Sequence, residues 1–161
     1  MNSRIFSLGR LAVTAMMLIA ASAVPASAQS ATLDVQGTFD GHGIGVVQFP
    51  TLRATANGGG SATQIGRFTY SLHATVNLPA NTSTGVFLLV FNNGDVIHGT
   101  FTGVGGAAPS SIVEDLVISG GTGRFQGASG SLRLSRVVDQ STLPAFESHT
   151  GTMTGTIVTQ K

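Results

Sequence analysis

The residues best suited to chemistry in this chain are an adjacent carboxylate pair, Glu114 and Asp115, and four histidines. The pair lies in an apolar run between 111 and 119 that is typical of a β-strand. Successive side chains of a strand point to opposite faces, so Glu114 is predicted to face the apolar side and Asp115 the other. A buried carboxylate has a raised pKa or pairs with a cation, here Arg133, Arg124 or His149.

His149 is predicted to be the polar group inside the fold, because it shares a strand face with Met153 and Ile157. His42 falls in a predicted turn, and His73 and His98 fall on the polar faces of their strands. Glu114 and His149 are therefore the candidates for proton transfer. The structural alternatives are an ion pair for Glu114 and a hydrogen-bonded core position for His149.

Motifs for metals and cofactors are missing from the sequence. The histidines form neither H-x-H nor H-x-x-x-H, and there is no Cys, so we expect no metal. Gly127-Ala128-Ser129-Gly130 lacks the spacing of a nucleophile elbow, and no G-K-[ST] phosphate loop is present. We expect no cofactor.

The segments that would position these residues read as eight strands with no helical period. Turn signals separate them: Gly41-His42-Gly43, a loop at 57–61, and the hairpin signal Asn92-Asn93-Gly94-Asp95. Pro50 predicts an edge position or bulge within the second strand, and the fourth strand, apolar on both faces, is expected to be covered on both sides. The predicted strands are 31–40, 44–56, 62–78, 85–91, 96–104, 111–119, 129–139 and 147–159.

Eight short strands predict an all-β fold, an eight-stranded antiparallel β-barrel, with a β-sandwich as the alternative. Closure is favoured because the sequence lacks the Lys and Pro that protect exposed sheet edges. A barrel of this size is filled by side chains or holds one small ligand. The candidate residues for contact with such a ligand are Met153, Tyr70 and Phe101.

The first 28 residues are predicted to be a signal peptide. Arg4 and Arg10 supply a positive region, 11–24 are apolar, and Ala26-Ser27-Ala28 is a cleavage site. We expect cleavage after Ala28, a secreted or periplasmic protein with no membrane span after cleavage, and one barrel domain at 29–161.

Composition narrows the partners of this domain. Lys and Arg number 8 against 7 Asp and Glu, without a basic stripe, so we expect no nucleic-acid binding. The lack of Cys excludes a disulfide framework, which leaves packing and hydrogen bonding to stabilise the fold.

A glycine-rich stretch at 118–132, I-S-G-G-T-G-R-F-Q-G-A-S-G-S-L, stands out between two apolar runs. Phe125 is expected in the core and Arg124 against nearby carbonyls or a carboxylate. The stretch resembles the G-G-T-G-R-F-x-G-A-x-G signature of the allene oxide cyclase-like barrels, to which plant dirigent proteins are related, and it is similar to small secreted bacterial proteins of that superfamily. The residues that carry the structural signature are Gly120, Gly121, Gly123, Arg124, Phe125, Gly127 and Gly130.

The resemblance covers roughly the last seventy residues. It implies an eight-stranded antiparallel barrel, often a homotrimer, with an apolar cavity that steers cyclisation or coupling of hydrophobic intermediates. It places no catalytic residue in this chain, because the signature is structural and one fold hosts many functions.

Three functions remain from the sequence. The leading hypothesis is a barrel that binds or sterically guides a small apolar molecule. The alternative is a non-catalytic structural or envelope-associated protein with a filled barrel. The third is a cyclase or isomerase that uses Glu114 or His149.

Overall fold

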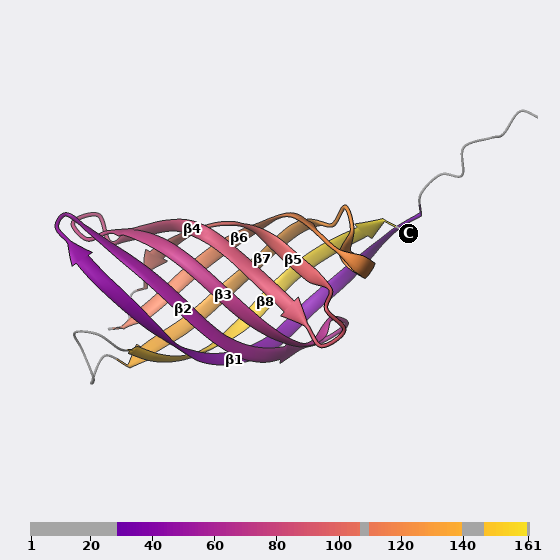
Figure 1. Ribbon diagram of the computed structural model, residues 1–161, viewed down its shortest axis with the longest axis horizontal. Helices are drawn as coiled ribbons and strands as arrows, with labels where there is room; N and C mark the ends of the chain where they lie inside the picture. The colour runs from indigo at the N-terminus through magenta and orange to yellow at the C-terminus, as the bar shows by residue number, and fades with distance from the viewer. Residues whose placement is uncertain (1–28, 107–109, 140–146, 161) are drawn as a thin grey trace, which may run out of the picture.

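The computed structural model describes residues 29–106, 110–139 and 147–160 of the 161-residue chain. They form one closed barrel of eight antiparallel strands, which confirms the predicted fold class (Figure 1). The strands are β1 (Ser30–Gln48), β2 (Thr51–Ala62), β3 (Gly66–Asn77), β4 (Thr82–Phe91), β5 (Val96–Gly105), β6 (Ser111–Gly121), β7 (Ser129–Asp139) and β8 (Glu147–Gln160).

The barrel closes because β1 is long enough to pair with both of its neighbours. It pairs with β8 from Ser30↔Gln160 to Gly43↔Glu147, and with β2 from Gly37↔Ala62 to Gln48↔Thr51. Each strand therefore has two hydrogen-bonded neighbours and no long edge is left, as the lack of edge-protecting residues predicts.

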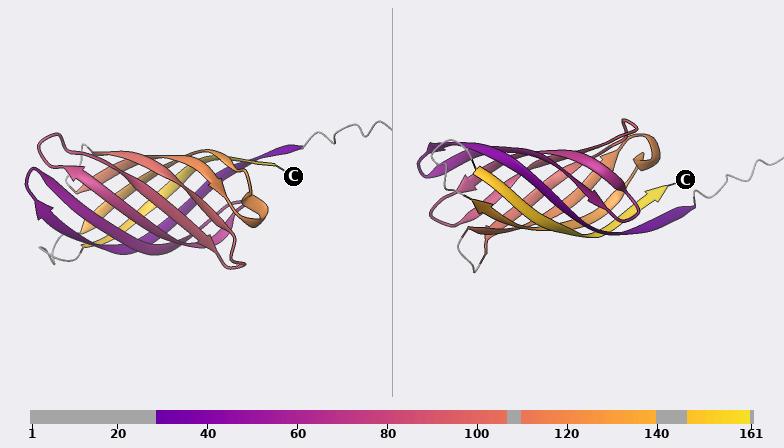
Figure 2. Two further views of the ribbon diagram at one scale, coloured as in Figure 1. Left: turned by 45° about the horizontal axis from the view of Figure 1, so that its top comes forward. Right: turned by 90° about the horizontal axis from the view of Figure 1, so that it is seen from below.

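The two ends of the barrel differ. A short 3₁₀ turn, η1 (Gly123–Phe125), folds across one end between β6 and β7 (Figure 2). Its Phe125 side chain is fully buried. Arg124 lies over the rings of Phe91 and Phe125, and its guanidinium donates a 2.6 Å hydrogen bond to the carbonyl oxygen of Ile65. The expected roles of both residues are confirmed. The opposite end carries the β1–β2 and β3–β4 turns.

Large side chains fill the interior by lying across small ones. The ring of Phe101 occupies the space that a β-carbon of Gly85 would need, and the ring of Phe87 does the same at Gly99. This alternation of large and small inward residues is how small barrels are packed. The buried apolar core contains Val35, Phe39, Ala56, Ile65, Phe68, Tyr70, Leu72, Phe87, Leu89, Phe91, Ile97, Phe101, Leu116, Ile118, Phe125, Ala128, Leu132, Leu134, Met153 and Ile157.

Two predicted breaks in the strands are wrong. β1 runs straight through Gly41-His42-Gly43, and β2 runs through the glycine-rich segment 57–61. The reason is packing: the hydroxyl of Tyr70 lies where β-carbons of Gly41 and Gly58 would be, so these glycines make room inside the barrel instead of turning the chain. Pro50 lies in the turn between β1 and β2, not in a strand.

The expectation that β4 is covered on both faces is also wrong for the described chain, since Val86 and Leu88 are exposed on its outer face. Among the described residues, no helix is long and apolar enough to span a membrane.

Candidate functional site

Five polar side chains meet inside the barrel: Tyr70 from β3, Glu114 from β6, Arg136 from β7, and Glu147 and His149 from β8. We call them the polar cluster. Glu114, Arg136 and His149 are buried and Glu147 is partly exposed. The strand alternation correctly predicted that Glu114 and His149 point inward.

Glu114 is paired with Arg136 through two hydrogen bonds. The Nε and one terminal nitrogen of Arg136 donate to the two carboxylate oxygens, at 3.1 and 2.9 Å. None of the three partners expected from the sequence is the right one: Arg133 pairs with Asp115 on the outside, Arg124 caps the η1 end, and His149 bonds to Tyr70. Arg136 is not among the partners predicted from the sequence, although it lies two residues after Leu134 and therefore on the same, inward face of its strand.

Tyr70 and His149 share a short hydrogen bond between the phenol oxygen and Nε2 of the ring. The phenol oxygen also lies 3.4 Å from the carbonyl oxygen of Asp40, to which it donates in the alternative orientation. Phe39 packs edge-on against the rings of both Tyr70 and His149. Burial raises the pKa of Tyr70, which keeps its phenol protonated.

The other ring nitrogen of His149, Nδ1, is buried without a hydrogen bond and lies 3.7 Å from an oxygen of Glu147. That oxygen also accepts a 3.3 Å hydrogen bond from Arg136. Burial, and then the positive charge of Arg136, lowers the pKa of His149 to about 4. The imidazole is therefore neutral at neutral pH, and a proton on Nδ1 facing the Glu147 carboxylate is the favoured tautomer.

The order Glu147, His149, Tyr70 is that of a proton relay, in which a carboxylate orients an imidazole that bonds to a hydroxyl. A general acid or base must reach its substrate within hydrogen-bond distance. Tyr70 and His149 are buried, and only Glu147, 24% exposed, borders solvent. The arrangement suits a structural polar core, and the catalytic roles of Glu114 and His149 stay predictions.

The three residues predicted to contact a ligand lie in three different environments. Met153 is buried in the apolar core. Tyr70 belongs to the polar cluster. Phe101 lies across Gly85, and both residues are among those that line a hollow in the barrel wall.

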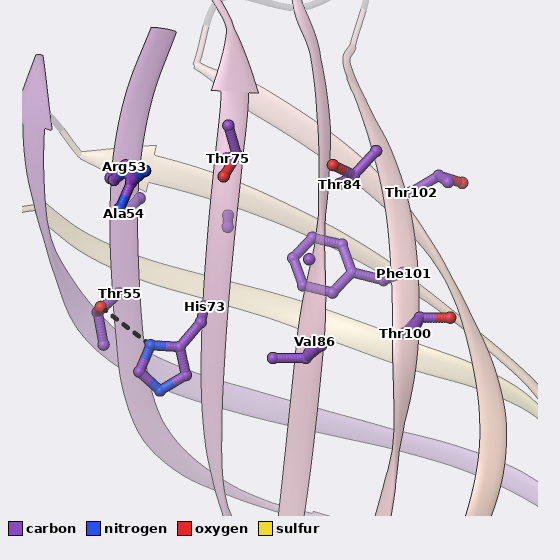
Figure 3. Close-up of a pocket in the computed structure, with 12 residues that line it drawn as sticks. Arg53, Ala54, Thr55, His73, Thr75, Thr84, Val86, Thr100, Phe101 and Thr102 are labelled. Atoms are coloured by element: carbon purple, nitrogen blue, oxygen red, sulfur yellow. Dashed lines mark hydrogen bonds between the residues drawn. The ribbon is translucent and has the colours of Figure 1, made fainter. Parts of the chain in front are cut away.

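That hollow, with a volume of about 780 Å³, lies across β2, β3, β4 and β5 (Figure 3). We call it the outer hollow. Its outward side chains stand in two rows of directly paired residues. One row is Arg53, Thr75, Thr84 and Thr102, and the other is Thr55, His73, Val86 and Thr100.

The outer hollow is rich in hydroxyls and poor in charge. The ring of His73 lies 3.3 Å from the hydroxyl of Thr55 (Figure 3). It also lies 3.4 Å from the hydroxyl of Ser71, so its orientation is held from two sides. Arg53 makes no ion pair with any residue in the described part of the chain. The sequence pattern does not indicate this site, because the rows exist only once the register between four strands is known.

The glycine signature has a structural place at the η1 end. Gly120 and Gly121 end β6, Gly123 begins η1 with φ of +57°, and Gly130 lies in β7. A β-carbon on Gly123 would collide with the carboxylate of Asp95, which also lies 3.6 Å from Arg124. The signature residues thus form the cap of the barrel.

Within the described ranges, no group of three or more His, Asp or Glu side chains is placed to hold a metal ion. Comparison with known proteins finds no matching family model, no similar curated protein and no similar solved structure. The site must therefore be interpreted from its own geometry.

Proposed function

We propose that this protein is a non-catalytic binding barrel whose interior is filled by its own side chains and whose ligand site is the outer hollow. The observation that carries the proposal is the contrast between the two sides of the wall. Inside, the rings of Phe101 and Phe87 occupy the spaces beside Gly85 and Gly99. Outside, the same strands β4 and β5 border a hollow of about 780 Å³, whose lining also includes Gly85 and Phe101.

The chemistry of the outer hollow fits an oligosaccharide. Thr hydroxyls both donate and accept hydrogen bonds, as sugar hydroxyls do. Neighbouring strands lie about 4.8 Å apart, so the directly paired Thr75, Thr84 and Thr102 stand close enough for several hydroxyls to contact one sugar ring. Val86 and the threonine methyl groups offer apolar contact to its C–H faces. Arg53 adds a planar donor that matches a sugar carboxylate.

The test is a binding titration with neutral and uronic-acid oligosaccharides. Thr84→Val and Thr102→Val each remove one hydroxyl from the hollow at constant shape, and we expect each to weaken binding about 3- to 10-fold. Thr152→Val, on the exposed outer face of β8, is the matched control and should bind normally. An oligosaccharide affinity that is unchanged by all three substitutions would contradict the outer hollow as the binding site.

A second candidate keeps the ligand inside the barrel, as the sequence hypothesis of a small apolar ligand does. It is favoured by the inward side chains of Leu52, Val76 and Ile112, which are only partly buried at the β1–β2 end. Met153→Ala, which enlarges the interior, should then change uptake of apolar molecules. Lost stability with an unchanged ligand profile favours the filled barrel.

We also infer that the chain is exported and related to the allene oxide cyclase-like barrels. The pattern of residues 1–28 supports export, and N-terminal sequencing of the mature protein should begin at Gln29. The closed eight-stranded barrel and the signature at 118–132 support the relationship. A shared fold does not by itself imply that this chain has the reaction or the trimeric state of those proteins.

A further inference from the structure

The end of the barrel opposite η1 carries an exposed apolar tip. It consists of Val46 and Val47 at the end of β1, Phe49 in the β1–β2 turn, and Leu78 in the β3–β4 turn; we call it the apolar tip. Phe49 is 79% exposed, the highest value among the large apolar side chains described. Both turns lie at the same extremity of the long axis (Figures 1 and 2).

The two turns are joined into one surface. The backbone N–H of Leu78 donates a 3.0 Å hydrogen bond to the carbonyl oxygen of Pro50. The hydroxyl of Thr51 donates to the carbonyl oxygen of Gln48 at 3.1 Å, which braces the β1–β2 turn. The apolar tip is therefore held in place by hydrogen bonds within and between its two turns.

The apolar tip is free of charge. Residues 46–52 and 76–81 contain no Asp, Glu, Lys, Arg or His. The charged residue nearest to these segments along the chain is Arg53, which is exposed on the outer wall of β2. An uncharged apolar tip beside a basic side chain matches a membrane surface, where apolar groups enter the acyl boundary and cations meet anionic headgroups.

The size of the tip argues against a second copy of the chain as its occupant. A stable protein interface buries about 800 Å² on each partner, over 20–30 residues. The apolar tip has four apolar side chains at the end of an elongated molecule. A lipid surface needs no complementary partner shape, since insertion of a few apolar side chains by about 5–10 Å is itself favourable.

We propose that the apolar tip inserts into a lipid surface and orients the barrel with its β1–β2 end against the bilayer. This is a second interaction of the protein. It uses apolar side chains that do not line the outer hollow, and the two proposals share only Arg53. Insertion can therefore fail while the oligosaccharide proposal stands, and the reverse also holds.

The chain has no tryptophan, which allows a reporter to be placed at one position. Phe49→Trp in the full chain puts the fluorophore in the apolar tip, and Val117→Trp puts it on the exposed wall of β6 as a matched control. Both are titrated with vesicles of phosphatidylcholine and phosphatidylglycerol, with and without brominated acyl chains. We expect a blue shift and bromine quenching for Phe49→Trp and neither for Val117→Trp.

Emission of Phe49→Trp that is unchanged by vesicles would overturn the proposal, even if the chain binds vesicles through another segment. A blue shift that appears without lipid and grows with protein concentration would overturn it in favour of a second copy. As a second measurement, Phe49→Ser should lower vesicle partitioning of the protein about tenfold or more, because it removes a large apolar group. Equal partitioning would count against insertion.

Discussion

At the scale of single residues, the pair Glu114–Arg136 is the interaction whose disruption should cost most. Both side chains are buried and joined by two hydrogen bonds. Arg136→Met leaves the Glu114 carboxylate buried without its cation, and we expect a loss of about 3–5 kcal/mol in the free energy of unfolding. Urea denaturation at pH 7 measures it.

The surface pair Arg133–Asp115 is the control for this prediction. Both of its side chains are about 61% exposed, so Arg133→Met should change stability by no more than about 1 kcal/mol. The double variant Glu114→Leu with Arg136→Met removes both buried charges and should recover much of the loss. Equal effects of Arg136→Met and Arg133→Met would show that the buried pair is not formed.

His149 predicts how stability depends on pH. Its pKa falls from 6.5 to about 4 in the folded state, so the unfolded chain binds a proton more readily. The contribution of His149 is complete above about pH 6.5 and is lost as the pH falls toward 4, up to about 3 kcal/mol. Denaturation at several pH values should show a shallower decline in this range for His149→Gln than for the wild type. Parallel curves would contradict a buried neutral imidazole.

Strand alternation alone placed the inward residues correctly but could not pair them. It put Glu114 and His149 inside, and applied to β7 it also puts Arg136 on the face of Leu134. To choose Arg136 over Arg133 as the partner of Glu114, the inward face must be assigned in both β6 and β7. The Tyr70–His149 bond joins strands 79 residues apart, and no local pattern contains it.

At the scale of elements, glycines inside strands are predicted to matter by the space they leave. A β-carbon on Gly58 would lie 2.6 Å from the Tyr70 hydroxyl and closer still to the carbonyl oxygen of Asp40. At the adjacent Gly59 it would meet nothing nearer than 3.4 Å. We expect Gly58→Ala to cost about 1–3 kcal/mol and Gly59→Ala to be near neutral.

Thermal and denaturant unfolding of the two variants, side by side, checks this prediction. Similar stabilities for Gly58→Ala and Gly59→Ala would mean that the Tyr70 hydroxyl does not lie against β2. The same packing explains why the turns at 41–43 and 57–61 were predicted wrongly. Glycine marks either a turn or a close approach, and only the position of Tyr70 across the barrel decides between them.

At the scale of the whole molecule, the sequence sufficed for the architecture but not for its surfaces. Eight strands, their antiparallel order and closure follow from alternation, turn residues and the lack of edge protection. The outer hollow and the polar cluster depend on the register among strands, which is set by long-range pairing. The glycine signature at 118–132 predicted Phe125 in the core, and the structure adds that this segment caps one end of the barrel.

The central claim is that the barrel is filled by its own side chains and binds on its outside. Native mass spectrometry of the protein purified from its own source, followed by denaturing extraction, tests this most directly. We predict the mass of the polypeptide alone, or of its assembly, with no apolar molecule released on denaturation, also after incubation with lipids and terpenoids. A discrete apolar compound retained at fixed stoichiometry, and released only on unfolding, would contradict the filled barrel and return the ligand to its interior.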